Sequence, residues 1–444
     1  MKKTFSVLMA LAILLSILGA GSALAEGKEK VTIVYHSGFG DLSQMENSGL
    51  FDEFDVEWVG VPENDLSSKI LLEMVSGSKS YDLALTPASG AKQFGTMGLL
   101  APLEPLDDWD DVFEANRDQH SVGDTIYGYP IIGDAYLLFY NTELLAKAGL
   151  ENAPQTWDEV QEYAKILTID ANGNNANSAD FDKANVVQYG WNYIGGPVDG
   201  NCYLLTTTSY SNGGVYIDKD YTNMTYEVVC DSEPMQKSAQ MLVDMLNAGL
   251  MPAGCVSYDY DEYEEIFFNG TVAMQMNWPG FFAMQFGTPT EGKIEVSVIP
   301  KGDSGVGSGP LGGWSVNIFK DAPHKEASEK FAKIFASPAG IDAFEAASGS
   351  SHMIPRHSFF DKYIAAAEAE GNTTMVNYHS ALLISAQTSQ PIDIAQTDAC
   401  SADTQKIASR YINGMLSGQY SVADGFAAMK KDLITSLEDG GYMQ

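Results

Sequence analysis

The segment that says most about the fold is VTIVYHSGFGD, residues 31–41. Its β-branched first half suits a buried strand, and its glycine-rich second half suits a flexible loop. A second run of this kind covers residues 56–61, apolar residues at helical spacing follow at 66–75, and residues 81–85 form a third apolar run. Strands that alternate with helices predict βαβ units, mainly parallel sheets and an α/β fold class. Ligands of such folds bind in the loops at the carboxyl ends of the strands.

The length and charge of the chain narrow the class of protein. The 444 residues exceed the ~150 residues of a typical domain about threefold, which predicts two domains with a sizeable core. There are 25 Lys and Arg against 59 Asp and Glu, a net charge of -34, while 45% of the residues are hydrophobic. The apolar content predicts a folded chain. The charge argues against nucleic acid and anionic membranes as partners, and it permits neutral or cationic small ligands.

The N-terminus has the pattern of an export signal. Lys2 and Lys3 precede an uncharged apolar run at residues 4–20, and small residues end at Ala23-Leu24-Ala25. This pattern predicts a signal peptide, residues 1–25, that is cleaved after Ala25. An uncleaved membrane anchor is the alternative, although the run is short for a spanning helix of ~20 residues. No cysteine in or just after the run offers a site for lipid attachment, so we expect a freely diffusing exported protein, in a periplasm.

Four cysteines remain in the exported part, namely Cys202, Cys230, Cys255 and Cys400. An even number in an exported chain permits two disulfides, and the three possible pairings stay open. Zinc is less favoured, because no C-x-x-C spacing occurs and no histidine lies close in sequence to a cysteine. No cofactor is expected.

The polar loop at residues 170–182 begins like a calcium loop, with Asp170-x-Asn172-x-Asn174. However, Asn175 stands where such a loop requires glycine, and Phe181 stands where it requires a bidentate glutamate. A solvated connector is therefore the favoured interpretation, and calcium is the alternative.

Several short motifs follow one another in an order that resembles a known family. Any one of them is weak alone, but together with further matches they cover nearly all of the chain after the signal. In this order they resemble the extracellular solute-binding proteins of ABC importers, and most closely the sugar-binding family that includes maltose-binding protein. The motifs include Gly128-Tyr129-Pro130, Tyr140-Asn141, Gly149-Leu150, Pro154-x-Thr156-Trp157-Asp158-Glu159, Phe268-Asn269-Gly270-Thr271 before Trp278, and Gly312-Gly313-Trp314.

The resemblance implies two α/β lobes, each made of non-contiguous segments, with hinge strands crossing between them and the ligand in the cleft. Lobe one is expected at residues 26–133 plus 316–362, and lobe two at residues 134–315 plus 363–444. All four cysteines then fall in lobe two, where bridges among them would stiffen that lobe. The implied function is non-catalytic capture of a small solute, with a mono- or oligosaccharide as the favoured class. The protein is expected to be a monomer that closes on the solute and then docks on a membrane permease.

The ligand contacts are chosen for what a sugar offers, which is hydroxyl groups for hydrogen bonds and flat C–H faces for aromatic rings. Trp278, Trp314 and Trp191 occupy or follow strand ends that face the cleft in the family, and the other three tryptophans are assigned to structure. Asp134 stands where maltose-binding protein has a sugar-contacting glutamate, and a carboxylate can accept from two hydroxyls at once. The remaining candidates lie in strand-end loops or in the loops that reach the ligand in the family: Tyr136, Phe39, Asp41, Thr86, Ser89, Asp199, Asn201 and Tyr203.

Two positions are interpreted as structural or as departures from the family. Arg356, which follows Met353-Ile354-Pro355, is expected in a structural ion pair. Thr404 stands where the family has an aromatic residue near the start of the last helices, which argues against a maltose-like subsite.

Two alternatives to sugar capture stay open. The same fold could bind a polyamine or another cation, because aromatic faces and carboxylates together hold ammonium groups. A carbohydrate-active enzyme is the other alternative. Its catalytic carboxylates would come from the acidic run at residues 259–265. Capping and solvation of a helix is the favoured role for this run, because no pair of its carboxylates can be assigned as acid and nucleophile. No phosphate-binding loop, zinc motif or serine elbow occurs, so we expect a protein that is not an enzyme.

Overall fold

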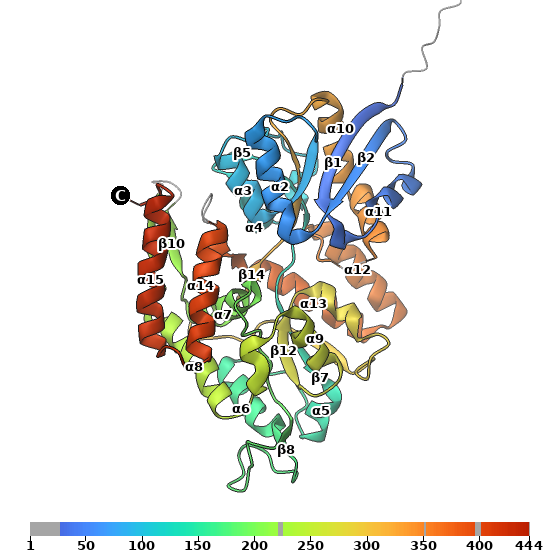
Figure 1. The fold of residues 1–444 in the computed structure, drawn as a ribbon. Coiled ribbons are helices and arrows are strands. Elements are labelled where there is room, and N and C mark those ends of the chain that lie inside the picture. Colours follow the sequence, from blue (N-terminus) through green and yellow to red (C-terminus); the bar gives the residue numbers. More distant parts are fainter. Residues whose placement is uncertain (1–26, 221–224, 350–351, 396–400, 444) are drawn as a thin grey trace, which may run out of the picture.

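A computed structural model describes residues 27–220, 225–349, 352–395 and 401–443. The predicted signal peptide and Cys400 lie outside these residues. The chain forms two α/β lobes, which Figure 1 shows one above the other with several segments passing between them. In the part of the chain that is described, no helix is long and apolar enough to cross a membrane.

Lobe one is built on a mixed five-stranded sheet with the order β2-β1-β3-β15-β6. β1 (Glu29–His36) pairs in parallel with β2 (Phe54–Val61) and with β3 (Leu83–Pro87). β15 (Trp314–Ile318) pairs antiparallel with β3 and with β6 (Tyr129–Ile132), and it reaches this sheet only after the chain has built most of lobe two. The three strands expected from the N-terminal sequence and their parallel pairing are confirmed.

Helices cover both faces of this sheet, which explains why β1 is apolar without alternation. Ile33 packs into one core cluster with Leu83 and Phe331, whereas its neighbour Val34 packs into another with Ala84 and Phe94. Successive side chains of a strand point to opposite faces, so a strand covered on both sides buries all of them. The main helices of this lobe are α2 (Glu63–Ser76), α3 (Ala88–Thr96), α4 (Glu114–Gln119), α10 (Lys325–Phe335) and α11 (Pro338–Ser348).

Lobe two has a different sheet at its centre. β7 (Leu137–Asn141) lies between β12 (Met274–Asn277) and β13 (Ile294–Ser297), and both pairings are antiparallel. The parallel pairing seen among the first strands of the chain therefore does not extend to this sheet. β12 follows β7 only after a long, mainly helical excursion, and β13 follows β12 after a short 3-10 helix (Pro279–Gln285), so neither strand is joined to β7 by the single crossover of a βαβ unit.

A helical layer packs beside this sheet and forms the largest core cluster. The last two helices, α14 (Ser401–Leu416) and α15 (Val422–Asp439), lie against each other and against α7 (Asp199–Asn212) and α8 (Glu233–Asn247), as the red and green ribbons of Figure 1 show. Thr404, on α14, is buried and donates its hydroxyl to the carbonyl of Ile394 at 2.7 Å. The other helices are α5 (Thr142–Lys147), α6 (Trp157–Leu167), α9 (Tyr260–Phe268), α12 (His357–Glu370) and α13 (Thr373–Thr388).

Helix starts follow the sequence closely. Thr156 caps α6 by accepting the backbone N–H of Glu159 at 3.2 Å. Asp259 and Glu262 form a complete capping box at the start of α9, which confirms the expectation that the acidic run at 259–265 caps a helix. Short polar side chains have this effect because they satisfy backbone donors that the first helical turn leaves free.

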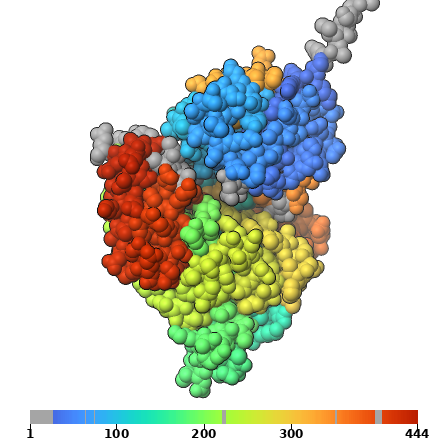
Figure 2. Space-filling model, in the orientation of Figure 1, coloured from blue at the N-terminus to red at the C-terminus, as the bar shows by residue number. Residues whose placement is uncertain are grey.

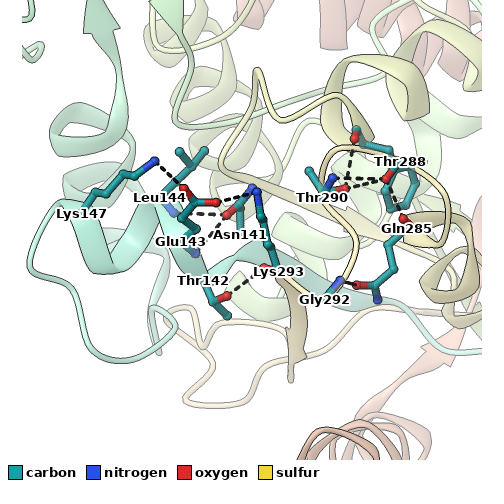
Figure 3. A network of polar contacts seen from close by, with 11 residues as sticks. Asn141, Thr142, Glu143, Leu144, Lys147, Gln285, Thr288, Thr290, Gly292 and Lys293 are labelled. Atoms are coloured by element: carbon teal, nitrogen blue, oxygen red, sulfur yellow. Dashed lines mark hydrogen bonds and ion pairs between the residues drawn. The ribbon is translucent and has the colours of Figure 1, made fainter.

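Polar contacts also tie the start of α5 to the sheet of lobe two (Figure 3). The Asn141 side chain accepts two backbone N–H groups of the first turn, both at 3.1 Å. The Glu143 carboxylate lies 2.6 Å from the Lys147 ammonium and 2.7 Å from that of Lys293, which precedes β13. These two lysines lower the pKa of Glu143 to about 2.

The described cysteines correct the disulfide hypothesis. Cys202, Cys230 and Cys255 are buried free thiols, so the two bridges permitted by the sequence are not formed and do not stiffen lobe two. Burial raises the pKa of Cys230 and of Cys255 to about 12. The three residues therefore act as small apolar parts of the core.

The loop at residues 170–182 is organised by one buried carboxylate. Asp170 accepts the backbone N–H groups of Asn172 at 2.8 Å, Asn174 at 2.9 Å and Asp182 at 2.9 Å. The hydrogen bond from Asp182 contributes most to lowering the pKa of Asp170 to about 2. Among the described residues, no group of three or more His, Cys, Asp or Glu side chains is placed to hold a metal ion.

Arg356 forms the predicted structural ion pair. It is 1% exposed, and its guanidinium donates to the Asp108 carboxylate at 2.7 Å, to that of Asp111 at 3.4 Å and to the carbonyl of Ala336 at 2.9 Å. These contacts fix the segment that leads from lobe one into α12.

Candidate functional site

A cavity of about 450 Å³ lies between the two lobes. Figure 2 shows these lobes as two masses, mainly blue above and mainly green and yellow below. The wall from lobe one comes from the ends of β1 and β3 and the residues just after them, as expected for an α/β sheet. The lining residues are His36, Phe39, Pro87, Ala88 and Ser89 from lobe one, Asp134, Leu311, Gly312, Gly313, Trp314 and His352 from the crossing segments, and Asp199, Tyr203, Tyr260, Trp278, Gly280, Phe281 and Ile392 from lobe two.

Three segments cross between the lobes, and Asp134 joins them. Its carbonyl accepts the backbone N–H of Gly312 at 2.7 Å, and its carboxylate accepts that of Met353 at 2.8 Å. Next to it, Gly133 donates to the carbonyl of Met353 at 2.9 Å. Asp134 therefore lies both on the cavity wall and at the point where the lobes are connected.

A histidine between two carboxyl groups completes this region. The Nδ1 atom of His352 lies 3.2 Å from the Asp134 carboxylate, and its backbone N–H donates to Glu345 at 3.3 Å. Burial acts to lower the pKa of His352, but the charges of Asp134 and Glu345 outweigh it and raise the pKa above the usual 6.5. Burial also raises the pKa of Glu345 to about 7. The raised pKa favours the imidazolium form of His352, which places a positive charge beside the Asp134 carboxylate.

Trp278 forms the main apolar surface of the lobe-two wall. It follows β12, and its ring meets Tyr136 edge to face at 4.2 Å between centroids and Tyr203 at 5.9 Å. A Cβ atom at Gly312 would lie 2.8 Å from the Trp278 ring. Glycine at this position is therefore required for the ring to pack against the crossing segment.

Trp314 forms the corresponding surface on the side of lobe one. It is the first residue of β15, stacks on His36 with 5.7 Å between centroids, and meets Phe39 edge to face at 4.9 Å. Phe39 also meets His352 at 5.9 Å. The two lobes thus each contribute one partly exposed tryptophan to the same cavity.

The structure brings several of the predicted site residues together on the cavity wall. These are Asp134, Trp278, Trp314, Phe39, Ser89, Asp199 and Tyr203.

The other predicted site residues do not line the cavity. Trp191 is fully buried and packs edge to face on Trp157 at 5.8 Å, and Tyr136 lies behind Trp278 with 1% exposure. Thr86 is buried and donates to the Asn317 side chain at 2.8 Å. None of the three lines the cavity, and their roles as ligand contacts stay predictions.

Asn201 and Asp41 are also held elsewhere. The Asn201 amide is buried and donates to the carbonyls of Gly196 at 2.8 Å and Ser409 at 2.9 Å. Asp41 is exposed and caps a short 3-10 helix (Leu42–Ser48) by accepting from the backbone N–H of Ser43 at 3.1 Å. As ligand contacts they too stay predictions.

Four larger side chains of the wall escaped the sequence analysis, namely His36, His352, Tyr260 and Phe281. His36 is the last residue of β1, so the rule on strand ends could have found it. The signal for Tyr260 is its place as the first residue of α9, directly after the cap. For His352 there is no local signal, because its partner Asp134 lies 218 positions away in the sequence.

Comparisons with known proteins show which family the chain is similar to. Residues 50–341 match a family model described as bacterial extracellular solute-binding protein. A Deinococcus radiodurans relative named as an ABC transporter-binding protein is 28% identical over 222 residues, and the alignment spans only about half of each chain, 49% of this one and 49% of the relative. The arabinooligosaccharide-binding protein of Bacillus subtilis is 24% identical over 367 residues, 74% of this chain and 76% of the relative.

The fold also matches that of a protein whose structure has been solved with a bound sugar. The structure of maltose-bound MalE3 from T. maritima superposes with a TM-score of 0.71 at 22% identity, covering 91% of this chain and 99% of that one. The predicted two-lobed binding-protein fold is thereby confirmed. The chain therefore belongs to the family of bacterial extracellular solute-binding proteins, as the order of its motifs predicted.

Proposed function

We propose that this protein captures a mono- or oligosaccharide between its lobes, without converting it, and delivers it to the permease of an ABC importer. The observation that carries the proposal is the placement of Trp278 and Trp314, from opposite sides, on one cavity that also holds the Asp134 carboxylate. Aromatic faces suit the C–H faces of a sugar ring, and the carboxylate suits its hydroxyls. The arabinooligosaccharide name of one relative and the maltose bound to one structural neighbour support the same solute class.

The charges at the hinge favour a neutral solute over a cation. The Asp134 carboxylate already has a partner in His352, whose raised pKa favours the imidazolium form. An ammonium ligand at this place would compete with the imidazolium, whereas a sugar hydroxyl can donate to a remaining lone pair of the carboxylate. Asp199, on the lobe-two wall, is the carboxylate that keeps the polyamine alternative worth testing.

Closure of the cleft follows from contacts that one solute would make with both walls. A ligand shifts a hinge equilibrium only by the contacts that it gains in the closed form, and here each lobe offers its own tryptophan. The lobe limits stay those predicted, with two changes. β15, which begins at Trp314, belongs to the sheet of lobe one, so we place the second crossing before Trp314. The limit at residue 362 falls inside α12, whose Phe360 packs in one cluster with Phe139 of lobe two, so we place the third crossing before this helix.

We also propose that the protein is exported to a periplasm, where it diffuses freely as a monomer. It rests on the signal pattern in residues 1–25 and on the extracellular nature of the family.

The test is calorimetric titration of the mature chain with a panel of pentoses, hexoses, disaccharides and short oligosaccharides, with sugar alcohols and polyamines as contrasts. We expect at least one saccharide to bind with an affinity that changes little between low and moderate salt, because a neutral ligand is insensitive to screening. Binding of a polyamine alone, weakening with salt, would establish the cation alternative. Product formed on long incubation with oligosaccharides would establish an enzyme.

Closure is tested separately by small-angle scattering. The radius of gyration should fall when the saccharide found by calorimetry is added. An unchanged profile at saturation would contradict the hinge mechanism.

A further inference from the structure

A buried acid lies directly behind the lobe-two wall of the cavity. Glu264 is 4% exposed and sits on α9, one turn after Tyr260, which lines the cavity. One carboxyl oxygen accepts from the Asn277 side-chain amide at 2.5 Å, and the other accepts from that of Gln275 at 3.3 Å. Both donors are neutral and both lie on β12, so α9 is tied to the strand that leads to Trp278.

The hydrogen bonds continue from this acid to Trp278. The side-chain oxygen of Asn277 accepts the backbone N–H of Trp278 at 2.8 Å, while the amide nitrogen of the same side chain donates to Glu264. Asn277 is 1% exposed and therefore has no water to replace a lost partner. The side chain of Asn277 thus links the Glu264 carboxyl group to the backbone of Trp278.

The surroundings of Glu264 disfavour a negative charge. Among the described residues, no Lys, Arg or His forms an ion pair with it. Its neighbours are the Asn277 and Gln275 amides of β12, the Tyr263 phenol on its own helix and the Tyr136 phenol just before β7. Burial raises the pKa of Tyr136 well above its usual value, and the charges of Asp199, from α7, and of Glu264 add to this effect. Burial raises the pKa of Glu264 to about 8, against the opposing effect of the bonds from Asn277 and Gln275.

We propose that Glu264 is a positioning residue that fixes Trp278 on the cavity wall through Asn277 while its carboxyl group is protonated, and that its ionisation releases Trp278. An ionised Glu264 would be a buried negative charge with only neutral amide donors around it, and the segment could relieve this charge by drawing in water or by moving apart. The use of Trp278 in solute binding rests on the proposed function, whereas its positioning does not.

The test follows Trp278 alone and needs no solute. The mature chain is produced with 5-fluorotryptophan, and the fluorine resonance of Trp278 is assigned by its absence from Trp278→Phe. Between about pH 6.5 and 9.5 we expect this resonance to shift in the unsubstituted protein with a midpoint near pH 8. In Glu264→Gln it should stay at its neutral-pH position throughout, because glutamine keeps an uncharged acceptor for Asn277.

Two further variants separate positioning from general disturbance. Glu264→Ala should displace or broaden the Trp278 resonance at every pH, since Asn277 then loses its acceptor, and Glu264→Gln should rescue it. Glu265→Gln, a change at the exposed neighbouring residue, should titrate like the unsubstituted protein.

The proposal is overturned if the Trp278 resonance does not move across this range, or if it moves equally in Glu264→Gln. If Glu264→Ala does not fold, the titrations of the unsubstituted protein and of Glu264→Gln still decide. Failure to find a sugar in the calorimetric panel would leave this result untouched, so the two proposals fail separately.

Discussion

The two walls of the cavity place the same kind of side chain by different means. On the side of lobe one, Trp314 is held by aromatic neighbours, His36 and Phe39, that stack on it or meet it edge to face. On the side of lobe two, Trp278 also contacts aromatic rings, but in addition its backbone N–H is held by buried hydrogen bonds that run from Glu264 through the Asn277 side chain. An apolar contact tolerates small shifts, whereas a buried hydrogen-bond path is costly to leave incomplete. We therefore expect the two walls to respond differently to substitution and to pH.

Removing either tryptophan should have the largest effect. Trp278→Ala and Trp314→Ala should each weaken binding of the saccharide identified by calorimetry by about 30-fold or more, or at least about 2 kcal/mol, as for buried aromatic anchors. Val187→Ala, at an exposed residue that does not line the cavity, is the control and should bind normally. A loss confined to one of the two tryptophans would show that the solute uses one wall only.

Filling the space beside Trp278 should disturb the lobe-two wall selectively. In Gly312→Ala the new Cβ would lie 2.8 Å from the ring, and overpacking of this kind costs about 1–3 kcal/mol. We expect about a tenfold weaker affinity and a shifted fluorine resonance for Trp278, with that of Trp314 less affected. Gly60→Ala, whose Cβ would meet its neighbours at 3.4 Å, serves as the matched control. Equal shifts of both resonances would mean that the walls are not independent.

The hinge histidine should titrate according to the charge of Asp134. Asp134→Asn removes the charge and should lower the pKa of His352, which is measured from its ring carbon resonances by NMR. The stability that this pair contributes is fully present below the unfolded-state pKa of about 6.5 and is lost as pH rises through the higher folded-state pKa. Asp134→Asn should therefore flatten the fall in unfolding free energy above pH 6.5. An unchanged pKa of His352 would remove the charge argument against a cationic ligand.

The smallest effect is expected at a predicted contact outside the wall. Asp41→Ala removes a cap on an exposed 3-10 helix, so it should cost less than about 1 kcal/mol of stability and change Kd less than about twofold. Thermal unfolding and calorimetry measure the two effects. A loss of affinity comparable to that of Trp278→Ala would place Asp41 in the binding site and would require the wall to be redrawn.

Local patterns in the sequence predicted much of the fold. The alternation of β-branched runs with helical spacing indicated the parallel strands of lobe one, and short polar residues marked helix starts at Thr156 and Asp259. The rule that ligands bind at strand ends selected Phe39 and Ser89, which line the cavity. Each of these inferences depends on residues within a few positions of one another, where backbone geometry and hydrogen bonding are settled locally.

Tertiary contacts decided the rest of the site. Trp191 and Trp278 both looked like cleft residues, but only the packing of lobe two buries the first and leaves the second on the wall. The antiparallel sheet around β7, the pairing of Asp134 with His352 and the path from Glu264 to Trp278 all join segments that are remote in sequence or belong to different elements. The sequence by itself determined which segments are strands and helices and where loops could meet a ligand. Which side chains share a cavity, and which acids are buried without a cation, was decided only when non-contiguous segments packed together, because burial depends on neighbours that no local pattern records.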